Sequence, residues 1–114
     1  MATISEFFDP LELGSNSLRE RAQQAKVNRS RQFVALEDEI EVAYFSLDDR
    51  SDIGTGVLYE VFVLPQYRNR GLGTLLVKFA EGITRSIGCV RMRLSPRTFD
   101  APVDQVWLES WYIK

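Results

Sequence analysis

The chain has 114 residues, of which 45% are hydrophobic. This is enough for one domain with a buried core, and it excludes a wholly disordered protein. Fourteen basic residues against 16 acidic ones give a formal charge of −2, which argues against a general nucleic-acid coat protein. Histidine is absent and Cys89 is the single cysteine. Histidine-dependent triads, histidine-ligated zinc sites and an intramolecular disulfide are therefore excluded, and no metal site is expected.

No apolar stretch approaches the length needed to span a bilayer, and the N-terminus lacks a basic-then-apolar signal. We therefore expect no membrane partner and a cytoplasmic location.

The amino-terminal region predicts one helix. Residues 1–14 are weakly patterned, but Ser17 followed by Glu20 spells a capping box, so a helix is expected from about Asn16 or Ser17. Two runs with alternating apolar residues follow, separated by an acidic turn at 37–39, which is typical of an antiparallel hairpin. The two expected strands are 32–36 and 40–47.

Residues 57–64 are apolar on both faces except at Glu60, which predicts a central strand covered on both sides. Pro65 ends this strand. Apolar residues then recur at helical spacing from Leu72 to Ile87, and Gly88 stands where a left-handed C-cap is needed. The remaining expected elements are a polar loop at 48–56, a strand at 89–94 and a short helix at 103–113. This order indicates a single α/β domain over residues 1–114.

The segment Arg68-Asn69-Arg70-Gly71-Leu72-Gly73-Thr74 follows a strand and opens a helix. Amide groups at a helix start have no acceptor within the helix, so they converge readily on an anion. The two glycines remove the Cβ atoms that would hold a ligand away from the backbone. The segment therefore predicts a phosphate-binding turn, in which the two arginines and the threonine hydroxyl supplement the backbone donors. An ordinary turn is the alternative.

The stretch from Val63 to Leu76 resembles the acetyl-CoA signature of the GCN5-related N-acetyltransferase (GNAT) superfamily. The family pattern is Arg or Gln, two spacers, Gly, one spacer, then Gly or Ala, and it falls on Arg68, Gly71 and Gly73. The resemblance implies a GNAT-like α/β fold, with a mixed, mostly antiparallel sheet flanked by helices. It implies acetyl-CoA as co-substrate and direct transfer of its acetyl group to a primary amine of a small molecule or peptide.

The same resemblance implies that the turn holds the CoA pyrophosphate and that the preceding strand pairs its backbone with the pantetheine arm. The implied cofactor-binding residues are Phe62, Val63, Arg68, Asn69, Arg70, Gly71, Leu72, Gly73 and Thr74.

Acyl transfer needs a neutral amine, and in a chain without histidine a carboxylate is the natural general base. Glu60 interrupts an apolar strand, on the same face as Leu58 and Phe62, and partial burial is expected to raise its pKa toward the working pH. The resemblance agrees, because many family members carry an acidic residue on this strand. A glutamate at the mouth of a cleft, or one paired with an arginine, is the alternative.

The segment Trp111 to Lys114 resembles the family stretch that reads aromatic, Tyr, spacer, Lys. The resemblance implies that Tyr112 is the general acid that protonates the leaving thiolate. The alternative is a tyrosine that packs on a short amphipathic helix.

The chain stops at Lys114, where the family continues into two final strands, so the resemblance is to a shortened member. The strand at 89–94 is then expected to have an open edge. A second copy in a homodimer, another partner or the amino-terminal segment would cover that edge. A non-catalytic CoA-binding or interaction module is the competing class of function.

Residues 18–47 also resemble the acetyltransferase toxins of bacterial toxin–antitoxin pairs, which acetylate aminoacyl-tRNA. This second resemblance implies tRNA as a partner, with basic side chains of the region contacting its phosphates. The residues concerned are Arg19, Arg21, Lys26, Arg29 and Arg31.

Overall fold

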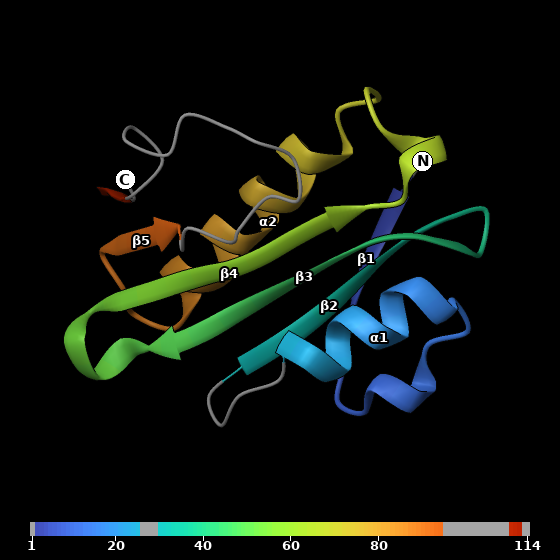
Figure 1. Cartoon of the computed structure of the whole chain (residues 1–114). Helices are drawn as coiled ribbons and strands as arrows, with labels where there is room; N and C mark the ends of the chain where they lie inside the picture. The colour runs from blue at the N-terminus through green and yellow to red at the C-terminus, as the bar shows by residue number, and fades with distance from the viewer. Residues whose placement is uncertain (1, 26–29, 95–109, 113–114) are drawn as a thin grey trace.

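A mixed β-sheet forms the centre of the protein. In the computed structural model, which describes residues 2–25, 30–94 and 110–112, the strands lie side by side in sequence order (Figure 1). They are β1 (Ala2–Phe7), β2 (Ser30–Glu37), β3 (Ile40–Arg50), β4 (Thr55–Val63), β5 (Arg91–Leu94) and β6 (Ser110–Tyr112). Neighbouring strands are antiparallel except β4 and β5, which are parallel. This arrangement confirms the predicted α/β class with a mostly antiparallel sheet.

Helices α1 (Asn16–Ala25) and α2 (Leu72–Ser86) cover opposite faces of the sheet (Figure 1). Leu18 of α1 is buried in one apolar cluster with Tyr44, and Leu76 of α2 is buried in the other. Since β4 contributes to both clusters, it is the central strand that its apolar sequence predicts. Neither helix of the described residues has the length and apolar content that crossing a membrane requires. Three short 3-10 helices complete the described elements: η1 (Pro10–Glu12), η2 (Ser51–Ile53) and η3 (Pro65–Tyr67).

The pattern of residues 1–14 did not predict β1. This strand pairs antiparallel with β2 from Ala2 to Phe7 and lies at one edge of the sheet. Its alternate residues are only partly buried, and Thr3, Ser5 and Glu6 are polar. An edge strand of this kind carries little apolar periodicity, so the ladder with β2 is what defines it.

The carboxy-terminal prediction was wrong in part. Residues 110–112 form strand β6 instead of the end of a helix, while 95–109 and 113–114 lie outside the described residues. β6 pairs with β5, with Tyr112 opposite Arg91, so the expected open edge along β5 is paired. Aromatic residues such as Trp111 favour strands as readily as helix faces, and pairing with β5 decides between the two.

Two local boundaries also differ from the prediction. The Ser15 hydroxyl accepts a hydrogen bond from the amide of Leu18, so Ser15 caps α1 in place of Ser17. The expected polar loop at 48–56 is shorter, because β3 continues to Arg50 and β4 begins at Thr55. The β3–β4 ladder is long enough to hold these polar residues in strands.

One residue of β4 approaches α2 very closely. An ideal Cβ placed on Gly56 would lie 2.7 Å from both Cγ2 and Oγ1 of Thr84. Thr84 is itself fully buried and donates a hydrogen bond to the backbone oxygen of Ala80 at 2.7 Å. The absence of a side chain at position 56 therefore sets the distance between the helix and the strand.

We expect Gly56→Ala to lower the free energy of unfolding by about 1–3 kcal/mol, because the added methyl group overpacks this contact. Gly82→Ala is the matched control: a Cβ at Gly82 meets nothing within 4 Å, so this change should raise stability by about 0.5–1 kcal/mol. Thr84→Ala should recover part of the loss in the Gly56→Ala background. Urea denaturation measures all three, and equal stabilities of Gly56→Ala and wild type would contradict the proposed contact.

Candidate functional site

A bulge in β4 decides which side chains face which helix. The β3–β4 register shifts between Ser46, which faces Glu60, and Leu47, which faces Leu58. Tyr59 is therefore the extra residue of β4. The shift places Leu58 in the apolar cluster under α2 and Phe62 in the cluster under α1. The expectation that Leu58 shares a face with Phe62 was wrong, because the strict alternation of a strand is interrupted at the bulge.

Beyond the bulge, β4 no longer pairs with β5. The two strands pair from Thr55 to Leu58 of β4, and within the described residues Val61, Phe62 and Val63 are paired with β3 alone. The amide of Leu64 donates to Val42 at 3.0 Å, so alternation turns the peptide groups of Phe62 toward β3 as well. The peptide groups of Val61 and Val63 therefore face the opposite, unpaired edge. Of the two predicted pantetheine partners, Val63 lies at this edge and Phe62 does not offer its backbone there.

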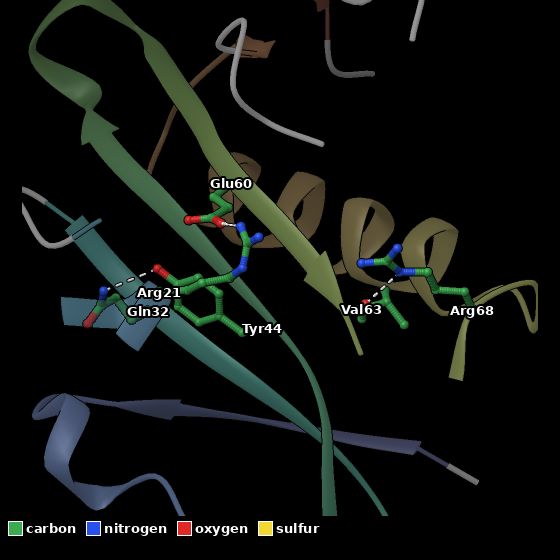
Figure 2. Close-up of polar contacts among 6 residues, drawn as sticks. All are labelled: Arg21, Gln32, Tyr44, Glu60, Val63 and Arg68. Carbon is green, nitrogen blue, oxygen red and sulfur yellow. Dashed lines mark hydrogen bonds and ion pairs between the residues drawn. The ribbon is translucent and has the colours of Figure 1, made fainter. Parts of the chain in front are cut away.

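Arg68 ties the following turn to the end of β4. Its Nε donates to the backbone oxygen of Val63 at 2.8 Å (Figure 2). Its guanidinium lies 5.3 Å from the centre of the Phe62 ring. The Nε of Arg68 is thus hydrogen-bonded within the protein. Arg68 positions the turn, in addition to any contact with a ligand.

The turn itself presents a row of backbone donors. Asn69 and Gly71 both have positive φ, 65° and 79°, and α2 begins with the hydrogen bond from Leu75 N–H to Gly71 O at 3.1 Å. Within the described part of the chain, the amides of residues 69–74 have no protein acceptor. A Cβ on Gly71 or on Gly73 would meet no atom within 4 Å. The backbone here is therefore open to a ligand, as the glycine pattern predicts, and it lies directly after the unpaired edge of β4.

The other predicted side chains of this turn differ in exposure. Arg70 is exposed, with its Nη1 3.8 Å from Glu37 Oε1 and its guanidinium 5.3 Å from the Tyr67 ring centre. Thr74 is exposed in the first turn of α2, whereas the side chain of Leu72 is buried. Leu72 can therefore contribute only its backbone amide.

Glu60 lies in a row of polar residues on the α1 face. The register aligns Gln32 of β2, Ser46 of β3 and Glu60 of β4. Gln32 donates to the backbone oxygen of Ala22 in α1 at 2.8 Å and to the Tyr44 hydroxyl at 3.3 Å. The Ser46 hydroxyl is buried beside the Tyr44 phenol. Burying polar groups under a helix costs free energy, and such groups are often kept where they bind or position a ligand. The row is therefore a candidate site.

Arg21 of α1 reaches across to this row. It forms an ion pair with the Glu60 carboxylate (Figure 2). Its guanidinium lies 3.7 Å from the centre of the Phe62 ring. The paired glutamate was the alternative interpretation of position 60, and the structure shows that pairing. Burial raises the pKa of the neighbouring Tyr44 phenol well above its ordinary value, and the negative charge of Glu60 adds to that rise. Tyr44 is therefore a neutral hydroxyl in this cluster.

Tyr112 is not brought to Glu60 by the sheet. It lies opposite Arg91, which in turn pairs with Thr55 at the start of β4. Five residues along a strand correspond to about 16 Å, so the backbone of Tyr112 is far from that of Glu60.

The described basic residues proposed to contact tRNA are engaged inside the protein. Arg19 donates to the backbone oxygen of Leu13 at 2.8 and 3.1 Å, and Arg31 makes two hydrogen bonds with Glu6 at 2.8 and 2.9 Å. Both guanidinium groups therefore have acceptors within the protein. The remaining members of the set are Arg21, which pairs with Glu60, and Lys26 and Arg29, which lie outside the described residues.

Solved structures of other proteins share the fold of this chain. A GNAT family acetyltransferase from Elizabethkingia anophelis with acetyl-CoA bound is 16% identical, with a TM-score of 0.62 over 82% of this chain and 63% of that one. A ribosomal-protein-alanine N-acetyltransferase from Brucella melitensis biovar Abortus 2308 is 15% identical, with a TM-score of 0.67 over 92% and 84%. An aminoglycoside 6'-N-acetyltransferase complexed with coenzyme A is 21% identical, with a TM-score of 0.62 over 81% and 60%. The chain thus spans less than two thirds of the first and third of these proteins.

Comparison with curated proteins gave no match. The model of the acetyltransferase (GNAT) family, in contrast, matches residues 2–107, which include the whole of the sheet from β1 to β5, both helices and the glycine turn. The chain belongs to the acetyltransferase (GNAT) family.

Proposed function

We propose that the protein binds acetyl-CoA at the end of β4 and transfers its acetyl group to a primary amine. The observation that carries this proposal is the row of amides at 69–74, which have no protein acceptor in the described part of the chain and follow an unpaired strand edge. The diphosphate of acetyl-CoA fits such a row, because amide hydrogen bonds to a charged oxygen and the dipole of α2 both favour it. Two structural neighbours were solved with acetyl-CoA or coenzyme A bound.

The unpaired edge of β4 fits the arm of the same molecule. The peptide groups of Val61 and the amide of Val63 face that edge, so an amide-containing chain can extend the sheet there as a strand would. The turn would thus hold the charged end and β4 would align the arm. Arg68, through its bond to Val63, keeps the two parts of the site in a fixed relation.

Glu60 is the proposed general base. Bound acetyl-CoA supplies a thioester, whose C–S bond breaks as the C–N bond to the amine forms, with the electron pair leaving on sulfur. Glu60 accepts the proton that the amine loses, directly or through a water molecule. Phe62 and the α1 face exclude water from around this carboxylate, whose side chain is 12% exposed.

Gly73 offers the sharper test of the turn, since Gly71 has a φ of 79° at which any other residue is strained. We expect Gly73→Leu to weaken acetyl-CoA binding by tenfold to a hundredfold, because the side chain keeps the diphosphate away from bonds worth about 1.5–3 kcal/mol each. Gly82→Leu, in the same helix and also in open space, should leave the affinity unchanged. Calorimetric titration with acetyl-CoA and with free CoA measures both variants. Equal affinities for Gly73→Leu and wild type would rule out the proposed cradle.

Glu60→Gln should lower kcat by about 10²–10⁴ while leaving the affinity for acetyl-CoA unchanged, because it removes the base and keeps the shape of the side chain. Released CoA, followed with a thiol reagent across a panel of amines, gives kcat. Tyr112→Phe is expected to lower kcat less than tenfold, given the distance along the sheet. A larger loss in Tyr112→Phe would restore Tyr112 as the acid. Tight CoA binding without turnover on any amine would favour the non-catalytic module.

A further inference from the structure

We propose that the acceptor is an amine carrying a negatively charged group close to its amino group, and that Arg21 binds that group. This inference rests on the proposed acetyl transfer and names the class of its second substrate. The chemistry required of the anionic group is that of a carboxylate or a phosphate.

The starting observation is where Arg21 lies. It extends from α1 to β4, bridging 39 residues of sequence, and pairs with the Glu60 carboxylate (Figure 2). Glu60 is 12% exposed and Arg21 is 31% exposed. The cation is thus the part of the pair that solvent and a ligand reach first.

The Arg21–Glu60 ion pair disfavours the binding of an amine that carries no negative charge. An ammonium group that approaches Glu60 meets the guanidinium at close range, and like charges repel. To reach the carboxylate it must also separate the existing ion pair, which leaves a partly buried guanidinium without that partner. For a monoamine, the repulsion by Arg21 therefore offsets the attraction to Glu60.

A zwitterionic acceptor removes this problem. Its ammonium pairs with Glu60 and its anion pairs with Arg21, so one internal ion pair is replaced by two pairs with the ligand. Guanidinium groups bind carboxylates and phosphates through two parallel hydrogen bonds, which also orients the amine.

Phe62 supports Arg21 during this exchange of ion-pair partners. Its ring stacks on the guanidinium at 3.7 Å, so Arg21 keeps a contact that does not depend on Glu60. The same ring lies 5.3 Å from the Arg68 guanidinium, at the end of β4. Arg21 can therefore hold its place beside the reacting end of the site when Glu60 changes partner.

The test compares amines matched in length, with and without an anion: β-alanine with 3-aminopropan-1-ol, and O-phosphoethanolamine with ethanolamine. Wild type should favour the anionic member of at least one pair by tenfold or more in kcat/KM, and the favoured pair distinguishes carboxylate from phosphate. Arg21→Gln should lower kcat/KM at least tenfold for the anionic amine and less than threefold for the neutral one. Arg85→Gln, an exposed charge-matched change near the end of α2, should alter neither.

Equal kcat/KM for both members of both pairs in wild type would overturn the inference while leaving the proposed transfer intact. An equal loss for both members in Arg21→Gln would also overturn it, because that is the effect of a merely structural residue. If Arg21→Gln does not fold, Arg21→Lys replaces it: it keeps the charge but not the two-pronged geometry, so the preference should fall severalfold. An unchanged preference in Arg21→Lys would then count against Arg21.

A binding measurement separates this inference from the proposed function. If acetyl-CoA binds but no amine is acetylated, the transfer proposal fails, and calorimetric titration with the same amine pairs in the presence of CoA judges the inference. Anionic amines should bind wild type at least tenfold more tightly than their neutral counterparts, and Arg21→Gln should lose the difference. Equal binding of both members to wild type would reject Arg21 as the determinant.

Discussion

The separation of β4 from β5 is the constraint on which the site depends. The two strands pair over four residues and no further in the described chain, so Val61 and Val63 lie at an edge that pairs with no described strand. A parallel pair needs a crossover, and here the crossover is the glycine turn followed by α2. The same connection that makes the sheet parallel therefore places a helix start, with its unpaired amides, at the end of the exposed edge.

The bulge at Tyr59 is the second feature of β4 that shapes the candidate site. By inserting one residue it moves Glu60 and Phe62 onto the α1 face while Leu58 stays under α2. The strand therefore packs against α2 in its first half and presents a carboxylate and an aromatic ring to α1 in its second half. Bulges near functional sites often redirect side chains in this way.

The α1 face of the sheet is part of the core and also carries the polar groups of the candidate site, which lowers the stability that burial provides. Its apolar cluster, centred on Tyr44 and Phe62, surrounds polar groups that a simple core would not contain. Gln32 is satisfied by α1 and by Tyr44, Glu60 pairs with Arg21, and the buried Ser46 hydroxyl lies beside the Tyr44 phenol. Such groups reduce the net stabilisation of the core and are kept where they bind or position a ligand.

The sequence by itself determined the features that depend on neighbours along the chain. Helical spacing located α2, the αL position of Gly88 marked its end, and the glycines at 71 and 73 located the open turn. Tertiary structure alone decided the rest, because it depends on pairing between distant segments. Only the ladders define β1 and β6, only the register shift turns Leu58 away from Phe62, and only the packing of α1 on β4 brings Arg21 to Glu60. Local patterns carry no information on such contacts, since register and long-range charge pairing are fixed by the assembled sheet.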